Sequence, residues 1–421
     1  MASVKNDSLE SKLLSLSEKA KMNLNTDFIK TGYVMLDMIM GGGLPMGKVI
    51  EIFSESGYGK STTVLSICLS LCRQGHKVLY IDAEGAINEL VKSMGFYGMY
   101  DSKTKTITTT DEFPNYVWSP DNPTGNFVVI QTSYFEDIEK YFETLLPKYD
   151  EKGNPIPSDF RLVVIDSVAM LAPQEYKGEG GEKGISIASN QPGVVAKLLT
   201  AFLKKFNGYK TMFNVSFFFI NQLREDLSMS FYKDTKKTAG CKALTYTEDI
   251  RLQLVNLPGG IEDIQETNTV SGKQKLVLGK EVGIRAVKNR LTNSGITLPL
   301  YIRFGYGISI ISALPYILPY KRIVNKAGEE TPVLTSSGGS WQTLTYNIYK
   351  TNEDGSIPKD KKGNPILEVI ETKSVRLNGR KELINFLKGN MKYIGYIIRD
   401  EDFNLLTEGI PEGYEAGVYY G

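Results

Sequence analysis

The sequence has very little histidine and cysteine. Its only histidine is His76, which excludes metal sites built from several histidines and His-based catalytic triads. The three cysteines, Cys68, Cys72 and Cys241, form no CxxC pair, so neither a disulfide framework nor a structural zinc is expected, and a reducing compartment is indicated. No apolar run approaches the roughly 18 residues of a membrane span, and the first residues lack a hydrophobic signal core. We therefore expect a soluble, cytoplasmic protein without a membrane partner.

The sequence also lacks an excess of charge of either sign. Its 421 residues include 49 Lys and Arg against 48 Asp and Glu, so any nucleic-acid surface must be a local patch. Hydrophobic residues make up 41% and charged residues 23%, which are globular proportions that exclude a disordered or collagen-like chain. The length is sufficient for one large α/β core and an accessory domain.

The pattern of apolar segments predicts a mainly parallel, doubly wound α/β core. Nearly continuous apolar runs are typical of strands that are buried on both faces. These runs span residues 49–53, 77–84, 161–171 and 215–222. An apolar helix is predicted at 62–72, and we assign 31–312 to the core. A surface insertion is expected at about 97–160, with a helix at 135–146, and 261–274 is expected to be an exposed connection.

Two further regions flank this core. Residues 1–30 are predicted to contain a short amphipathic helix at 7–22 that serves oligomerisation, although its leucine stripe could equally pack on its own core. This stripe consists of Leu9, Leu13, Leu16 and Ala20. Residues 313–421 are predicted to form a small α+β domain, with a helix at 380–391.

The strongest local motif lies between the first strand and the helix that follows it. Residues 54–61, SESGYGKS, match the P-loop pattern GxxxxGK[ST] except that Ser54 replaces the first glycine. Backbone N–H groups of such a loop hold phosphates, Lys60 adds positive charge at the β- and γ-phosphates, and the Ser61 hydroxyl can bind Mg²⁺. Serine adopts the left-handed conformation poorly, so Ser54 is expected to shift the loop or weaken its grip. The alternative interpretation is an ordinary loop before a helix.

Two acidic residues end further strands. Asp166 follows the apolar run at 163–165, as a Walker B aspartate does, and could hold the water shell of Mg²⁺. Glu84 ends YIDAE, where a carboxylate can polarise the water that attacks a γ-phosphate. Each residue alone could be a satisfied strand-end carboxylate. Together with the loop, they favour phosphoryl transfer.

In this order along the chain, the motifs resemble the RecA family of recombinases, bacterial and T4-type phage members included. The matching segments are 31–53, ESGYGKSTT (55–63), YIDAEGA (80–86), VVIDSVAMLAP (163–173), FFINQLR (218–224) and RAVKNR (285–290). The resemblance covers about 28–310 and implies a RecA-type P-loop NTPase core. It implies a DNA-dependent ATPase with ATP and Mg²⁺ as cofactors, acting in homologous recombination and repair. Such a protein forms helical filaments of its own copies on single-stranded DNA, pairs that strand with double-stranded DNA, and hydrolyses ATP at subunit interfaces.

The resemblance also implies roles for single residues. Asp166 would be the Walker B aspartate, and Glu84 the catalytic base or water-positioning group. Gln222 would sense the γ-phosphate and lead into the second DNA-binding loop. Lys288 and Arg290 would reach the neighbouring subunit's ATP and stabilise the transition state, as an arginine finger does. The residues implied to bind nucleotide and Mg²⁺ are Glu55, Ser56, Gly57, Tyr58, Gly59, Lys60, Ser61 and Thr62.

Two loops are the expected DNA contacts. Residues 223–242 combine cations, aromatic residues and glycine, a composition that suits a loop following a nucleic-acid strand, although a solvated loop is the plain alternative. Its expected DNA-binding residues are Arg224, Phe231, Lys236, Lys237, Gly240 and Lys242. The first loop would be 177–193 and would contribute Lys183. Because no arginine occurs between 178 and 196, backbone N–H groups are an alternative contact there.

Two other interpretations stay open. One is a different RecA-fold motor or regulator, such as a hexameric helicase, which the KNR run at 288–290 disfavours. The other is a DNA-binding filament protein that uses ATP only as a structural ligand. Ser54 keeps this second interpretation open, as does the absence from 85–95 of an aromatic residue that could stack on adenine. The sequence leaves open whether a loader or a single-strand-binding protein is a partner.

Overall fold

The computed structural model describes residues 26–398, apart from internal gaps. These gaps are 102–103, 112, 175–193, 226–235, 239–241, 261, 270–271, 293, 310, 312, 337, 353–357, 359 and 362–365. The helix predicted at 7–22 and the first DNA loop with Lys183 lie outside the described residues. Phe231 and Gly240 lie outside them as well.

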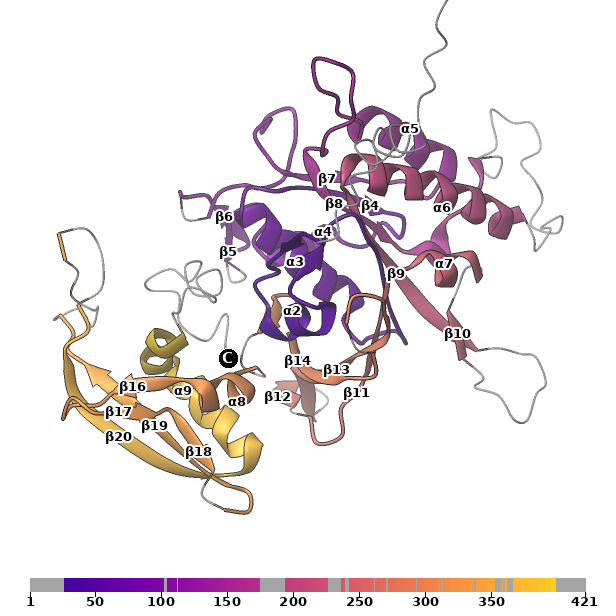
Figure 1. The fold of residues 1–421 in the computed structure, drawn as a ribbon. Coiled ribbons are helices and arrows are strands. Elements are labelled where there is room, and N and C mark those ends of the chain that lie inside the picture. Colours follow the sequence, from indigo (N-terminus) through magenta and orange to yellow (C-terminus); the bar gives the residue numbers. More distant parts are fainter. Residues whose placement is uncertain are drawn as a thin grey trace, which may run out of the picture.

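The core is a large, mostly parallel sheet with helices on both faces (Figure 1). Its six parallel strands follow the order β11-β3-β9-β8-β4-β7. They are β3 (Val49–Ser54), β4 (Lys77–Asp82), β7 (Phe127–Ile130), β8 (Phe160–Asp166), β9 (Ser216–Glu225) and β11 (Ile250–Asn256). The doubly wound α/β fold expected from the continuous apolar runs is therefore confirmed.

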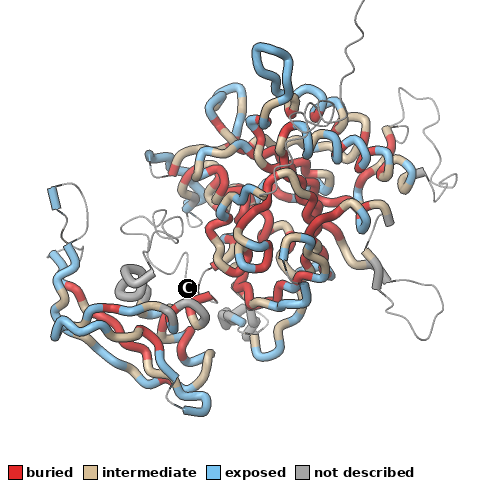
Figure 2. The backbone as a smooth tube through the Cα atoms, viewed as in Figure 1, coloured by how far each residue is buried: buried red, intermediate tan, exposed pale blue. Residues whose placement is uncertain are grey.

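The helices cover the two faces of the sheet in separate hydrophobic cores. One face carries α2 (Val34–Met40), α3 (Lys60–Arg73) and α4 (Asn88–Ser93), and the other carries α5 (Phe135–Leu145) and α6 (Val194–Phe213). Alternate residues of each strand supply each core: Ile50 and Ile52 of β3 face α3, whereas Phe217 and Phe219 of β9 face α6. Figure 2 shows that buried residues are concentrated in the central part of this core, in the sheet and the helices packed on it.

Antiparallel strands extend the sheet beyond β11. They are β13 (Gly272–Asn289), β14 (Thr297–Arg303) and β15 (Gly307–Ser309). The prediction of an exposed connection at 261–274 is wrong, because β12 (Glu262–Thr269) pairs with β13 as a hairpin. Its sequence, EDIQETNT, has almost no apolar face, so the pattern that identifies a strand is missing. A second short hairpin forms where β10 (Lys236–Thr238) pairs with β9, and α7 (Lys242–Thr247) follows it.

The segment 97–160 is only partly a surface elaboration. It contains the short pair β5 (Met99–Asp101) and β6 (Thr106–Thr108), and the predicted helix at 135–146 is confirmed as α5. However, β7 from this segment is the edge strand of the main sheet, which the sequence did not indicate. The segment therefore completes the sheet as well as decorating it.

The C-terminal part has its own antiparallel sheets and its own core. Its elements are α8 (Leu314–Ile317), β16 (Arg322–Val324), β17 (Glu330–Pro332), β18 (Leu334–Ser336), β19 (Trp341–Tyr349), β20 (Val369–Asn378) and α9 (Gly379–Ile398). Leu344, Leu377 and Leu383 are buried between the sheet and α9. The predicted helix at 380–391 and the small α+β character are confirmed. A two-residue pair, β1 (Phe28–Ile29) with β2 (Leu44–Pro45), and two 3₁₀ turns at 168–170 and 318–320 complete the described elements.

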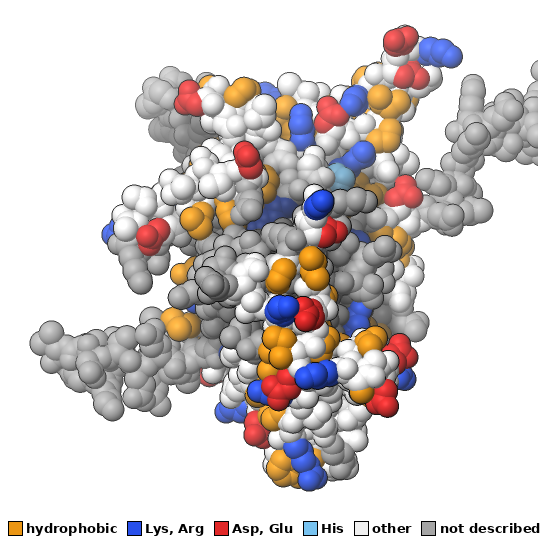
Figure 3. Space-filling model, turned by 90° about the vertical axis from the view of Figure 1, so that its left-hand side faces the viewer, with side chains coloured by type: hydrophobic (Ala, Val, Ile, Leu, Met, Phe, Trp, Pro, Cys, Tyr) orange, Lys and Arg blue, Asp and Glu red, His pale blue; other side chains and the backbone are white. Residues whose placement is uncertain are grey.

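The surface matches the balanced composition. Figure 3 turns the left-hand side of Figure 1 to the viewer, and the described part of that face has acidic, basic and hydrophobic side chains interspersed. A DNA-binding surface must therefore come from a local arrangement of cations rather than from this face as a whole. Among the described residues, no helix is both long and apolar enough to cross a membrane.

Candidate active site

Four of the predicted site residues, Lys60, Glu84, Asp166 and Gln222, come together where four neighbouring strands end. In the register of the sheet, Ser54 at the end of β3 lies opposite Gln222 of β9, and Asp166 at the end of β8 lies opposite Asp82 of β4. Glu84 follows β4 by two residues. Since β3, β9, β8 and β4 are parallel, their carboxyl ends lie on one edge, where ligands bind in such sheets.

The loop after β3 has the backbone of a phosphate cradle. Gly57 and Gly59 have φ angles of 78° and 80°, and Gly59 is the N-cap of α3. A Cβ on Gly59 would stand 2.7 Å from Ile302 Cδ1, so only glycine fits there. Ser54 is the last residue of β3 and does not have a positive φ. The expected strain at Ser54 is therefore absent, because the left-handed positions belong to the two glycines.

Lys60 is buried inside this loop. Its Nζ donates to the backbone oxygens of Ser54 and Glu55 at 3.2 and 2.9 Å, and lies 3.3 Å from Ser54 Oγ. Burial lowers the pKa of Lys60, and the nearby carboxylates of Asp166 and Glu84 oppose that shift. The ammonium group is thus held where the loop closes, and the serine at position 54 supplies an additional hydroxyl beside it.

Asp166 is a buried carboxyl group with two hydroxyl partners. Tyr80 Oη donates to its Oδ2 at 2.7 Å, and the Ser61 hydroxyl also hydrogen-bonds to it. Burial raises the pKa of Asp166 to about 6, against the lowering effect of these two hydrogen bonds. A serine hydroxyl beside a carboxylate is the oxygen donor set that Mg²⁺ takes together with nucleotide phosphates and water. The described residues contain no cluster of three or more His, Cys, Asp or Glu that could hold a metal without them.

Glu84 is exposed, and its carboxylate is held by two donors. Ser167 Oγ donates to Glu84 Oε1 at 2.6 Å, and Gln222 Nε2 donates to the same oxygen at 2.9 Å. An exposed carboxylate fixed in this way can orient and deprotonate a water molecule. Sequence reasoning missed Ser167, as well as Tyr80 at Asp166. The signal in the sequence was their position: Tyr80 lies inside the apolar strand β4, and Ser167 directly follows the apolar strand β8.

Gln222 lies where β9 leaves the sheet. Beyond it, Leu223, Arg224 and Glu225 pair with Thr238, Lys237 and Lys236 of β10. The predicted DNA-binding cations Arg224, Lys236 and Lys237 are thus placed on the two strands of a hairpin, and Lys242 begins α7 just after it. The sequence predicted a loop here, because polar residues interrupt the apolar pattern.

Lys288 and Arg290 do not approach the P-loop of their own chain. Lys288 Nζ donates to Thr245 O at 2.6 Å, and Arg290 Nη2 donates to Tyr246 O at 3.2 Å. Arg290 Nη1 lies 3.4 Å from Oδ1 of Asp249, whose Oδ2 accepts the backbone N–H of Val49 at the start of β3. The P-loop begins at the other end of β3, after Ser54. At about 3.3 Å per residue, the length of β3 from Val49 to Ser54 is roughly 16 Å. Burial lowers the pKa of Lys288, with the charge of Glu248 opposing that shift.

Comparisons with known proteins found the following similarities. The family model of the RecA N-terminal domain matches residues 2–96 and 157–309. A "Protein RecA" of Fusobacterium nucleatum is 28% identical over 319 residues, which cover 75% of this chain and 70% of the relative. One from Caulobacter sp. (strain K31) is 26% identical over 344 residues, or 81% of both chains. Among solved structures, a "Crystal structure of the RadB recombinase" matches with a TM-score of 0.40 and 20% identity, over 67% of this chain and 98% of that one.

Proposed function

This chain belongs to the RecA family, whose members act in recombination and repair and bind ATP and DNA, and we propose that it is an ATP-dependent strand-exchange protein. Its copies assemble as a helical filament on single-stranded DNA, and each ATP is hydrolysed between two subunits. The filament then pairs its strand with double-stranded DNA. Base pairing supplies the sequence specificity, so the protein itself needs no contacts that read the bases.

The observation that carries this proposal is the hydrogen bond between Gln222 and Glu84. Gln222 is the point where β9 enters the hairpin with the candidate DNA-binding cations, and Glu84 is the candidate catalytic carboxylate. A single side-chain contact of 2.9 Å therefore joins the two activities. This arrangement supports a DNA-dependent ATPase more directly than a protein in which ATP is only a structural ligand.

The chain's own residues have separable roles in hydrolysis. When bound, ATP and Mg²⁺ supply the reacting phosphoanhydride and neutralise its charge, and Lys60, Ser61 and Asp166 are the residues that would hold them. Glu84 orients the attacking water and accepts its proton. Ser167 and Gln222 keep the carboxylate of Glu84 in place through its Oε1 atom.

Lys288 and Arg290 act on the ATP of the adjacent subunit. Their distance from the P-loop of their own chain supports this assignment, because no side chain spans roughly 16 Å. Backbone oxygens of α7 fix both cations, so their position follows α7 and the hairpin that precedes it. Two cations brought to a developing phosphate charge lower the barrier, and hydrolysis then depends on assembly.

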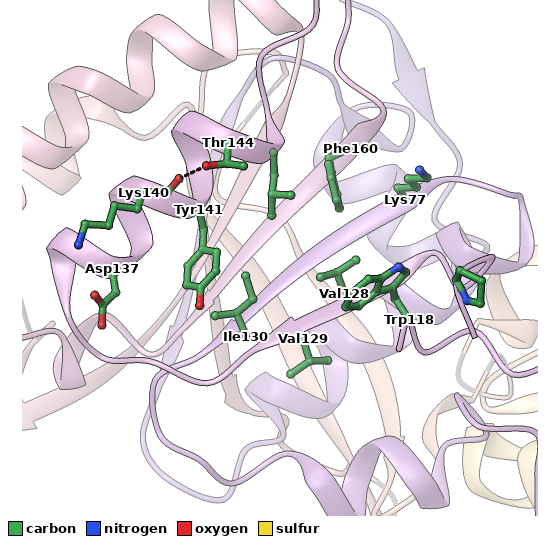
Figure 4. Close-up of a pocket in the computed structure, with 13 residues that line it drawn as sticks. Lys77, Trp118, Val128, Val129, Ile130, Asp137, Lys140, Tyr141, Thr144 and Phe160 are labelled. Carbon is green, nitrogen blue, oxygen red and sulfur yellow. Dashed lines mark hydrogen bonds between the residues drawn. The ribbon is translucent and has the colours of Figure 1, made fainter. Parts of the chain in front are cut away.

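The neighbouring copy has a candidate docking surface in the groove between β7 and α5 (Figure 4). This groove encloses about 770 Å³ and is lined by Val128 and Ile130 of the edge strand, with Tyr141 on α5. Trp118 and Tyr141 are 47% and 41% exposed, so they offer two aromatic surfaces to a partner that enters the groove. We assign the groove to the predicted helix at 7–22 of a second copy, because its leucine stripe would offer the matching apolar side.

The decisive experiment is ATP hydrolysis with and without single-stranded DNA, combined with electron microscopy of the same samples. We expect DNA to stimulate hydrolysis and open helical filaments to form in the presence of ATP. Lys60→Ala is the control for hydrolysis at this site, because it removes the buried ammonium of the loop. A folded protein that neither assembles on DNA nor responds to it would refute the proposal, and closed rings would favour a hexameric motor.

A further inference from the structure

Glu51 is a buried acidic residue in the middle of β3, the strand that leads into the P-loop. Its side chain is almost inaccessible, at 1% exposure, and lies among apolar strands. A carboxylate in such a place is costly unless it is fully paired. Here Glu51 Oε2 accepts Arg251 Nε at 2.6 Å, and Oε1 accepts Asn221 Nδ2 at 2.7 Å. The two partners come from the strands on either side, β11 and β9.

Arg251 links Glu51 to the hairpin formed by β9 and β10. Its second arm, Nη2, donates to Thr238 Oγ1 at 2.9 Å, and Thr238 is the residue of β10 that pairs with Leu223. The guanidinium group also stacks over the Phe53 ring, 4.4 Å from its centroid. One planar group is thus fixed against β3 on one side and against the base of the hairpin on the other.

Asn221 links Glu51 to Gln222, which contacts the candidate catalytic carboxylate of Glu84. Its Oδ1 accepts the backbone N–H of Gln222 at 2.9 Å, and Gln222 Nε2 donates to Glu84. The hydrogen bonds form an unbroken series from Thr238 through Arg251, Glu51, Asn221 and Gln222 to Glu84.

Glu248 is a second acidic residue close to Arg251. It is fully buried, and one of its oxygens lies 3.6 Å from Arg251 Nε. Burial, together with the adjacent charge of Glu51, raises the pKa of Glu248 to about 9. The shorter contact of Arg251 Nε is the one with Glu51 Oε2 at 2.6 Å, so Glu51 is the acidic residue that orients Arg251.

We propose that Arg251, Glu51 and Asn221 are positioning residues that transmit the docking of DNA on the hairpin to Gln222 and Glu84. The proposal rests on the proposed function, since it presupposes that DNA stimulates hydrolysis. DNA that fixes the hairpin also fixes Thr238, and Thr238 fixes the Arg251 guanidinium. The same group holds Glu51 and, through Asn221, the backbone of Gln222. The position of Gln222 against Glu84 is then favoured, and this preference couples the two sites energetically.

The test is Thr238→Val, which removes one hydroxyl and keeps the shape of the side chain. The readout is the stimulation factor, the hydrolysis rate at saturating single-stranded DNA divided by the rate without DNA. We expect this factor to fall about tenfold, because a hydrogen bond to a charged group is lost. Thr238→Ser restores the hydroxyl and should restore the factor. Thr211→Val is the matched control, since its hydroxyl donates to Asn207 O within α6.

A second variant completes a double-mutant cycle with Thr238→Val. Arg251→Lys keeps a cation beside Glu51 but has no second arm for Thr238, so it should lower the stimulation factor to a similar extent. If both residues act in one series, the double variant loses little more than either single variant. Full additivity of the two losses would overturn the proposal. So would an unchanged stimulation factor in Thr238→Val while the wild type is stimulated. A wild type without DNA stimulation would instead refute the proposed function, and this inference with it.

Discussion

Replacing Asp166 by Asn should make the nucleotide-free protein more stable. Burial raises the pKa of Asp166 from 3.8 to about 6, so the folded state disfavours its charged form. At 1.36 kcal/mol for each tenfold change in acidity, this difference corresponds to about 3 kcal/mol at neutral pH. Asparagine carries no charge, and its side-chain oxygen can still accept the hydrogen bond from Tyr80.

The sign of the effect fixes its pH dependence. Between pH 3.8 and about 6, folded Asp166 binds a proton more tightly than it does in the unfolded chain, so wild-type stability falls as pH rises through this window. The advantage of Asp166→Asn should therefore be absent below about pH 4, grow up to pH 6 and then level off. The same variant should lose Mg²⁺-dependent ATP hydrolysis. The charged carboxylate of Asp166 destabilises the fold when no Mg²⁺ is bound, but it is needed to hold Mg²⁺ during turnover.

Urea unfolding at pH 4 to 8, without nucleotide or Mg²⁺, measures this difference. The chain has two tryptophans, so a Trp341→Phe background leaves Trp118, beside the core sheet, as the reporter of core unfolding. Asp121→Asn changes an exposed carboxylate and is the matched control. Parallel pH profiles for wild type and Asp166→Asn would refute the argument that burial is the main influence on Asp166.

Three further predictions concern turnover and assembly. Glu84→Gln should lower kcat by a factor of about 10² to 10⁴ while ATP still binds, as measured by turnover and by nucleotide titration. Lys60→Ala and a Lys288→Ala, Arg290→Ala double variant should each be inactive, yet their mixture should regain part of the activity, since some interfaces then combine an intact P-loop with intact cations. A mixture that stays inactive would contradict action between subunits. Tyr141→Glu should prevent filament formation in micrographs without lowering the unfolding midpoint, and normal filaments would exclude the groove as an interface.

Local sequence patterns predicted the strand ends that carry the candidate active site. The P-loop, Asp166 and Glu84 each lie at the end of an apolar run, and parallel strands place their carboxyl ends on the same edge of the sheet. The helix predicted at 62–72 and the strand that contains VIEIF follow from the same local periodicity. The strands β12 and β10 were missed, because their sequences, EDIQETNT and KKT, lack the apolar alternation on which such predictions depend.

The sequence by itself determined which segments form buried strands and which loop can hold phosphates, since both depend on neighbours within a few residues. Only the tertiary structure decided what Glu51 is for. In VIEIF it is one acidic residue in an apolar run, and its partner Arg251 is 200 positions away along the chain. Strand order and register bring the two together, and these are set by the packing of the whole sheet rather than by any local pattern.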